Sequence, residues 1–544
     1  MSILPYSYHT FLFPFIWKTS EDKTREDFEK ILSVGTRWID KSWKSEKVRE
    51  DVKELSAWFQ DYAAFQYFTK SANNVIFNTR GDNLVRCFEY YQHKGTYTIS
   101  KGKAEYQLVI NNVRLNVYDI GIAVLIFELE NHEHKSLDDV DAINEYGRRI
   151  NLPILIAAKG KKNVSHPICA DKISISFGNI TFTEDYMETM SFIGEDTSYL
   201  DKHITMNYIM RPIQELLDGI GQDNGGYEVT THEEHQNNNT FYIKPCIDDR
   251  MFVCCLVRDD DYSNKIKEFD IAREEYRYLS DCFIFNEKGR AEEYGLDLDI
   301  YKLMFIETSA TSQSATMRHE LLKRCVYDRW IDYGTIHGVT HHSMVCLTSA
   351  YEGIIDSVIN PFLTEYVQLA ILTVVQRAVI LLLSDEAAEV ANGFAGDEVI
   401  TKEEIASIEK LQARYVTAQN QLLLAEVTVQ EQGVEIYEML KNELYIKENM
   451  ADLDSEISNL RDVADIANAR LERLNDEEEA RREKKIEDSL TLLSAILGGV
   501  SIAEPVSQLF EFDSLPCESE WFMLSLMFGI LLGIITKYIL SRKR

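Results

Sequence analysis

The chain has 544 residues, 45% of them hydrophobic, which excludes a largely disordered protein and allows two or three folded domains. Its formal net charge of −32 excludes nucleic-acid binding by the body as a whole, although a local basic pocket stays compatible with it. The nine cysteines are scattered and form no C-x-x-C pair, which indicates a reduced, cytosolic compartment.

Residues 1–350 have the pattern of an α/β domain. The N-terminal segment MSILPYSYHTFLFPFIW is apolar but has no basic n-region, so we expect a buried strand or loop and no signal peptide. A helix is predicted at SLDDVDAINEYGRRI, which opens with a Ser-x-x-Asp cap signal at Ser136 and Asp139. Strands are predicted at runs rich in Val, Ile, Phe and Tyr, namely YQLVINN, VRLNVYDIG, AVLIFELEN, KISISFG, MFVCCLV and KLMFIE.

Residues 351–488 predict a helical stalk. The stretch 353–392 is strongly apolar, but Gln376 and Arg377 interrupt it, which favours a buried helix over a membrane span. Residues 403–488 contain no proline and are dense in Glu, Lys, Arg, Leu and Ala. One continuous helix of this length would extend ~130 Å and would need partner helices for stability.

Residues 489–544 predict a hairpin of two transmembrane helices. The stretches 489–510 and 521–540 are apolar and long enough to cross a hydrocarbon core about 30 Å thick. Basic residues precede the first stretch and end the chain after the second, while the loop EFDSLPCESE has four acids and no base. We therefore expect a multi-pass protein of the cell inner membrane, with the N-terminal domain, the stalk and the C-terminus in the cytoplasm.

One face of the first predicted span has small and polar residues at helical spacing. These are Thr491, Ser494, Gly498 and Ser501, with Glu504 at the next turn. In an oligomer this face could line a water-filled path, whereas small residues also allow close helix packing. A carboxylate in an apolar span is costly unless it faces water or a cation, so Glu504 predicts a cation-attracting ring; alternatively the membrane helix ends before it.

Two short stretches of the α/β domain carry candidate ligand-binding residues. Arg148 and Arg149 follow a predicted helix and suit a phosphate or another anion, with a surface salt-bridge pair as the alternative. Asp218 lies beside glycines and could accept hydrogen bonds from a ribose or an amine, although a helix C-cap is the commoner meaning of LDGIG. The histidines of YGTIHGVTHH lack firm metal-ligand spacing, and no P-loop, G-x-S-x-G or H-E-x-x-H is present. We predict no enzyme, no metal site and no cofactor.

The order of an α/β cytosolic domain, a long helical stalk and two C-terminal transmembrane helices resembles the CorA metal-ion transporter superfamily, whose members are funnel-shaped homopentamers. The Gly-Met-Asn signature of that superfamily is absent, since the chain reads SIAEPVSQLFEFDS after the first span, which counts against magnesium selectivity. The N-terminal half is similar to the CorA-like membrane effectors associated with type III CRISPR systems. The similarity rests on the stretches YHTFLFPF, DIGIAVLIFELEN, INEYGRRI, LLDG and YDRWIDYGTIHG.

This resemblance implies an antiviral membrane channel or effector that assembles as a homopentamer. Its activating ligand would be a nucleotide second messenger, a conjugate of S-adenosylmethionine and AMP, sensed through Arg148, Arg149 and Asp218. The lipid bilayer and other copies of the chain are the further partners, with magnesium ion as a second candidate ligand and no direct nucleic acid. The rival hypotheses are a divalent metal-ion transporter and a membrane-anchored structural tether.

Overall fold

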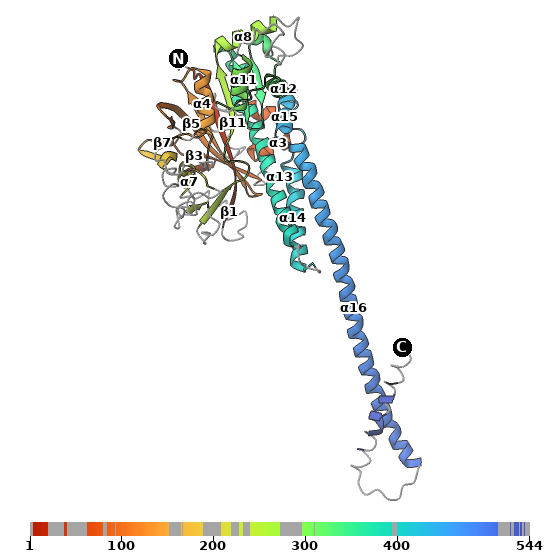
Figure 1. Ribbon diagram of the computed structural model, residues 1–544. Helices are drawn as coiled ribbons and strands as arrows, with labels where there is room; N and C mark the ends of the chain where they lie inside the picture. The colour runs from red at the N-terminus through yellow and green to blue at the C-terminus, as the bar shows by residue number, and fades with distance from the viewer. Residues whose placement is uncertain are drawn as a thin grey trace. The chain divides into compact units, whose positions relative to one another are not determined.

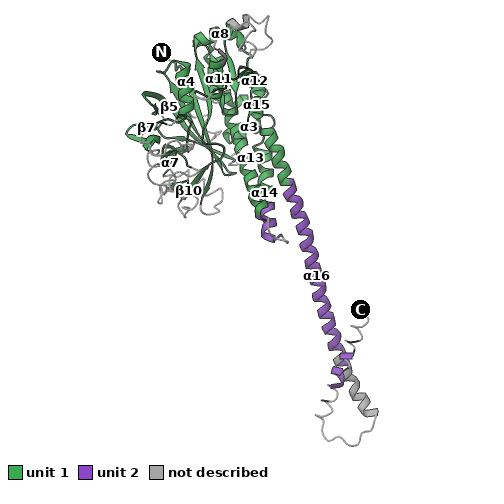
Figure 2. Cartoon of the chain, in the orientation of Figure 1, with its two compact units in different colours: residues 1–392, 410–457 green, residues 393–409, 458–544 purple. Residues whose placement is uncertain are grey.

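The computed structural model describes most of the chain. The described residues are 4–19, 37–40, 63–79, 84–92, 94–151, 165, 167–188, 208–218, 228–231, 240–271, 296–308, 311–393, 400–509, 523, 527–531, 534, 535 and 538. They fall into two compact units (Figure 2). The first comprises Met1–Asn392 and Lys410–Ile457, and the second Gly393–Glu409 and Ser458–Arg544. Most of the predicted stalk up to residue 457 thus belongs to the same unit as the sheet.

The first unit is built on a mixed sheet of 14 strands within the described residues (Figure 1). The order is β12-β13-β14-β11-β1-β6-β5-β4-β7-β8, with β10 and β9 attached at β1, and β3 and β2 attached at β5. Two pairs, β11 with β14 and β10 with β9, are parallel, which confirms an α/β domain with a mixed sheet. The strands are β1 (Ser7–Thr19), β2 (Trp38–Asp40), β3 (Val85–Tyr90), β4 (Gly95–Lys101), β5 (Ala104–Tyr118), β6 (Ile122–Asn131), β7 (Lys172–Phe177), β8 (Ile180–Asp185), β9 (Glu228–Thr230), β10 (Thr240–Pro245), β11 (Phe252–Arg258), β12 (Val326–Tyr327), β13 (Ile336–Val339) and β14 (Ser343–Thr348).

The N-terminal segment forms a buried strand, one of the two structures expected for it, and this strand, β1, lies within the sheet. β1 lies between β6 and β11, with Phe11 opposite both Phe127 and Val253. Neighbouring residues such as Phe11 and Leu12 are both fully buried, so the strand is covered on both faces, which is why it shows no alternation of polar and apolar residues. The predicted strands YQLVINN and VRLNVYDIG form one strand, β5, with an irregular register between Ile110 and Asn112.

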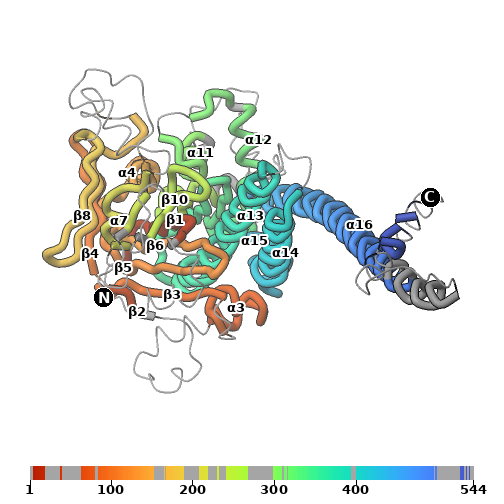
Figure 3. The backbone as a smooth tube through the Cα atoms, turned by 90° about the horizontal axis from the view of Figure 1, so that it is seen from below, coloured from red at the N-terminus to blue at the C-terminus, as the bar shows by residue number. Residues whose placement is uncertain are grey.

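Helices cover the sheet. Phe11, Phe13 and Phe15 of β1 belong to one buried cluster with residues of α4, α7, α8 and α11. Beside the sheet, α13, α14 and α15 lie side by side in two views (Figures 1 and 3). The helices are α3 (Lys70–Phe77), α4 (Leu137–Gly147), α7 (Arg211–Leu217), α8 (Asp260–Ile271), α11 (Leu296–Phe305), α12 (Ala315–Cys325), the short turn η7 (Ile331–Tyr333), α13 (Val367–Gly393), α14 (Lys402–Gln421), α15 (Glu431–Glu443) and α16 (Ile446–Leu509).

The prediction of a strand at KLMFIE is wrong, because most of that stretch forms the end of α11. The buried residues Ile300, Leu303 and Met304 follow the spacing i, i+3 and i+4, which is helical. Six apolar-rich residues cannot separate a strand from a short buried helix, and the preceding LDLDIY completes the helical pattern.

The apolar stretch before residue 393 is a buried helix, as predicted. It runs from Glu352 to Gly393 and opens with the 3-10 turn η8 (Glu352–Ile354) and the π-helical segments η9 (Ile355–Ile359) and η10 (Phe362–Tyr366) before α13. By length and composition it is the one helix of the described residues that could cross a membrane. However, 83% of its most apolar window is buried within the unit, which is typical of a core helix.

The region 403–488 is mostly helical, as predicted, but it is divided into three helices, α14, α15 and α16, and is not one continuous helix. Between α14 and α15 the backbone carbonyls of Leu422 and Leu424 accept hydrogen bonds from Gln376 Nε2 and the Tyr437 hydroxyl, at 2.9 and 2.7 Å. Between α15 and α16, Tyr445 has a φ of 55°. Tertiary contacts thus replace the helical hydrogen bonds at the first break, and a left-handed residue makes the second.

Candidate functional site

The two predicted arginines leave the end of α4 and enter the core of the first unit. Arg148 is the C-cap of α4, and its carbonyl accepts from Met251 N at 2.8 Å. A Cβ at the preceding Gly147 would lie 2.7 Å from Ile99 Cδ1, so glycine is what lets the helix end pack this closely. Arg148 is 2% and Arg149 6% exposed. Both arginines are therefore buried, which rules out the alternative of a surface pair.

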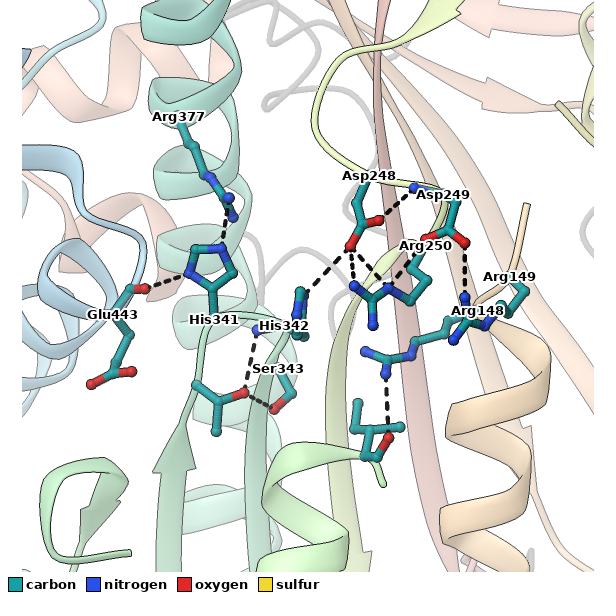
Figure 4. Close-up of polar contacts among 12 residues, drawn as sticks. Arg148, Arg149, Asp248, Asp249, Arg250, His341, His342, Ser343, Arg377 and Glu443 are labelled. Atoms are coloured by element: carbon teal, nitrogen blue, oxygen red, sulfur yellow. Dashed lines mark hydrogen bonds and ion pairs between the residues drawn. The ribbon is translucent and has the colours of Figure 1, made fainter. Parts of the chain in front are cut away.

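The loop between β10 and β11 supplies two carboxylates and a third arginine (Figure 4). Arg149 Nη1 donates to Asp249 Oδ2 at 2.8 Å, and Arg250 donates to Asp248 Oδ2 from Nε at 2.9 Å and from Nη2 at 2.5 Å. We call Arg148, Arg149, Asp248, Asp249 and Arg250 the arginine cluster. Within it, each carboxylate is held by an arginine of the chain itself.

Among the described residues, Arg148 has the most unused donors of the cluster, and the Nε of Arg149 also has no acceptor. Arg148 Nη2 donates to the Ile306 carbonyl at 3.3 Å, while its Nε and Nη1 are buried and have no acceptor among the described residues. Burial, and then the charges of Arg250 and Arg149, lower the pKa of Arg148 to about 9, although Glu145 and Asp248 oppose the shift. Buried donors without acceptors are costly, so an oxyanion that met them would be held firmly.

Two neighbouring histidines, at the turn between β13 and β14, extend the cluster (Figure 4). His342 Nδ1 lies 3.9 Å from Asp248 Oδ2, and burial, followed by the charges of Arg250 and Arg148, lowers the pKa of His342 to about 3. His341 Nε2 accepts from Arg377 Nη2 of α13 at 2.7 Å, so its Nδ1 donates to the Glu443 carbonyl at the end of α15, at 2.9 Å. Both imidazoles are neutral near pH 7, and His341 joins the turn to two helices.

The arrangement suits a phosphate group. The side chains of Asp248, Arg250 and His342 are between a quarter and a third exposed, so this side of the cluster can be reached from solvent. An incoming phosphate would compete with Asp248 for Arg250 and would supply acceptors to Arg148. The motif EYGRRI predicted Arg148 and Arg149 as candidate ligand-binding residues. Asp248, Arg250 and Arg377 were not predicted, since only the folded chain brings them together, and the histidines were noticed only as weak metal ligands.

Asp218 lies apart from the arginines. Met210, just before α7, donates to the Ile150 carbonyl at 2.7 Å, and Asp218 caps the other end of that helix, about 10 Å further at 1.5 Å per residue. Its Oδ1 accepts from Val229 N at 3.3 Å. In the part of the chain that is described, Asp218 has no contact with Arg148 or Arg149. The helix C-cap reading of LDGIG thus describes what Asp218 does in this structure.

The predicted pore-lining residues fall on α16. The hydroxyls of Thr491 and Ser494 donate to carbonyls four residues earlier, each at 2.8 Å, and Gly498 lies on the same helix. Ser501 and Glu504 lie in its last turns, but their side chains are outside the described residues, as are the acidic loop 511–520 and most of the predicted second span. The structure therefore places the first predicted span in a helix and leaves the hairpin untested.

Neither the family models, nor the curated proteins, nor the solved structures with which the chain was compared contain a match. The function is accordingly argued from the geometry of the chain.

Proposed function

We propose that this protein is a ligand-gated membrane effector of the CorA-like kind, activated by a nucleotide second messenger such as the conjugate of S-adenosylmethionine and AMP. The observation that carries the proposal is Arg148, a buried guanidinium with two donor nitrogens that have no acceptor within the described residues. A phosphate of the messenger would fill that need, with Arg149 and Arg250 beside it. Asp218, which resemblance rather than contact assigns to the messenger, would reach a more distant part of it.

The contacts of His341 offer a route from this site to the stalk. His341 directly precedes His342 in the turn between β13 and β14, and its ring is hydrogen-bonded to Arg377 of α13 and to the last carbonyl of α15. Its ring also lies 5.7 Å from the ring of Tyr445, the left-handed residue directly before α16. A phosphate that displaced Asp248 would shift the balance of charge at His342, and the turn could pass this change to the start of α16. Gating requires only that the messenger binds one arrangement of these helices better than the other.

Exposed apolar side chains near the C-terminus support a membrane location. On α16, Leu490, Leu493 and Leu497 are 55–62% exposed. Beyond α16 the described residues include Met527 and Ile534, which are 68% and 59% exposed. Exposed large apolar residues in such number mark a surface that a bilayer or other copies of the chain cover. We propose that two C-terminal spans form there and that a homopentamer perturbs the bilayer when the messenger binds.

Two rival functions give different expectations. A divalent metal-ion transporter would conduct without the messenger, and the absent Gly-Met-Asn signature counts against it. A structural tether would conduct under no condition, and it gives no reason for a buried arginine whose donors are unused.

Ion leakage from liposomes tests the proposal. Purified protein is reconstituted and leakage is measured with and without the conjugate at fixed magnesium. We expect leakage only with the conjugate, and its loss in the double variant Arg148→Ala, Arg149→Ala, which should still assemble. Arg461→Ala is the matched control, because that side chain is 62% exposed. Magnesium flux that ignores the conjugate would favour the transporter, and no flux under any condition would favour the tether.

A further inference from the structure

A second polar site lies between the sheet and the helix that leads into α13. It is a cavity of about 280 Å³ in the first unit, a volume that suits a small ligand. Its sheet side includes Asn112, where the register of β5 shifts, and its helix side includes Leu363 and Thr364 of the π-helical segment η10. Irregular strand registers and π-helical turns both recur at functional sites, and here one of each borders the same cavity.

A row of polar side chains crosses the sheet beside the cavity. Thr10 of β1 and Asn112 of β5 both lie opposite Glu128 of β6, so the three side chains leave the same face of the sheet. Two residues further along β1 on this face, Leu12 lies opposite Ile126, and both are fully buried. The face therefore changes from apolar to polar at the place where the cavity lies.

The three carboxylates of the lining already have partners within the chain. The pairs are Glu128 with Arg114 at 2.5 Å, Glu89 with Asn112 Nδ2 at 3.0 Å, and Glu130 with His132 Nε2 at 3.0 Å. A cationic ligand thus finds no carboxylate without a partner in the lining, and three carboxylates around one guanidinium repel an anionic ligand. The lining favours a ligand without charge.

The groups of the lining that lack partners are neutral. Gln368 and Thr10 are only 7% and 4% exposed, and neither side chain has a hydrogen-bond partner among the described residues. Asn112 Oδ1 is buried and lacks a donor within the same part of the chain. Burial, and then the charge of Glu130, raise the pKa of Tyr8 to about 12, so its hydroxyl stays protonated and can both donate and accept. Buried polar groups without partners are costly, so a ligand that supplied partners would gain affinity from them.

We infer that this cavity binds a neutral polyhydroxylated ligand of the size of a monosaccharide. A hydroxyl group both donates and accepts, so hydroxyls can bond to the Gln368 amide and to the hydroxyls of Thr10 and Tyr8. Because Gln368 lies on the helix side and the other two on the sheet side, the ligand needs hydroxyls in several directions, as around a sugar ring. Phe77 and Leu363 add apolar surface for the C–H groups of such a ring. No residue of the arginine cluster lines this cavity, so the inference does not depend on the proposed function.

Ligand-observed NMR of the full-length protein, in a detergent without a sugar headgroup, tests the inference. The probes are D-glucose, D-galactose, D-mannose, D-ribose and myo-inositol. We expect saturable binding of at least one of these neutral polyols. Cyclohexanol, which keeps a ring with a single hydroxyl, and the phosphate ester of the polyol that binds, which the carboxylates repel, should each bind at least about tenfold more weakly.

Thr10→Val and Gln368→Leu should each weaken the binding of that polyol about tenfold, because each removes one of the unpaired groups. Since neither group has a hydrogen-bond partner among the described residues, both variants should melt at or above the temperature of the wild type. Gln419→Leu on α14, where the side chain is exposed, is the matched control and should bind as the wild type does.

The inference is overturned if no polyol binds saturably, if cyclohexanol or the phosphate ester binds equally well, or if both folded variants bind as the wild type does. Variants that both melted well below the wild type would also count against it, because Thr10 and Gln368 would then serve the fold itself.

Discussion

Because Arg148 is buried and leaves donors unused, we do not expect its side chain to stabilise the fold. Replacing even a buried ion pair by well-packed apolar residues is often neutral or stabilising, by about 1–4 kcal/mol, and a buried guanidinium without a carboxylate partner has less to offset its desolvation. We therefore expect Arg148→Met to leave the melting temperature unchanged or raised, although it abolishes the response to the messenger. Differential scanning fluorimetry with and without the conjugate measures both effects. A loss of stability above about 2 kcal/mol would instead make Arg148 a structural residue.

The buried histidines predict a sensitivity to acid. Burial lowers the pKa of His9 and His337 to about 4, and burial with neighbouring arginines lowers that of His342 to about 3. The unfolded chain, with histidine pKa values near 6.5, binds more protons between these limits, so stability falls as the pH drops from about 6.5 towards 4. We expect the melting temperature to fall over this range, and less steeply in His342→Asn. Equal slopes in both would contradict the assignment, and the partly exposed His132→Asn is the control.

The sequence predicted two of the five residues of the arginine cluster, because the contacts that complete the cluster join residues far apart in the chain. Arg148 and Arg149 are adjacent in sequence and lie between a predicted helix and an apolar run, a local pattern that indicates a candidate anion site. Arg250 comes about a hundred residues later in the chain, in a stretch whose only signal is the pair of acids before it. Arg250 joins the cluster because the register of β11 against β1 brings its loop to the end of α4.

At the scale of elements, the break between α14 and α15 shows what a helical pattern leaves out. Composition predicts helix through residues 403–488, and most of these residues are helical. The break is made by partners elsewhere in the chain, including Phe68, whose backbone forms an isolated bridge with Thr428. Helix propensity is a local property and cannot predict such a contact, because the partner lies hundreds of residues away in the chain. Conversely, the cap at Ser136 is local, and the structure has it where the sequence predicts it.

Gln376 should hold this break in place. Its Nε2 donates to the Leu422 carbonyl and lies 2.9 Å from the Tyr437 hydroxyl, and the side chain is 1% exposed. Gln376→Leu leaves these buried groups with fewer partners, so we expect a loss of about 2–3 kcal/mol in the free energy of unfolding. Urea denaturation measures it. Gln419→Leu on α14, where the side chain is exposed, should change the stability by less than about 0.5 kcal/mol. Equal effects would show that the break does not depend on Gln376.

At the scale of the whole molecule, the proposed membrane location leaves two candidate segments for a span. One is the helix from Glu352 to Gly393, which is apolar enough but mostly buried against the sheet and its neighbouring helices. The other is the C-terminal region, where apolar side chains such as Leu490 and Met527 are 59% and 68% exposed. Burial is the reason why the proposal assigns the span to the C-terminal region, since a helix whose apolar surface already forms a protein core has none left for lipid.

Removing the C-terminal region separates these two possibilities. We expect the full chain to sediment with membranes and to resist extraction at alkaline pH, and a chain that stops after Asp488 to be found in the soluble fraction with its sheet intact. The truncated chain retains the whole of the buried helix and loses the two apolar stretches together with the acidic loop 511–520 and the basic residues 542–544. Circular dichroism of the soluble product would show that it folds. If the truncated chain still resisted extraction, the buried helix would have to be the span, and the packing of α13 against the first unit would have to open in the membrane.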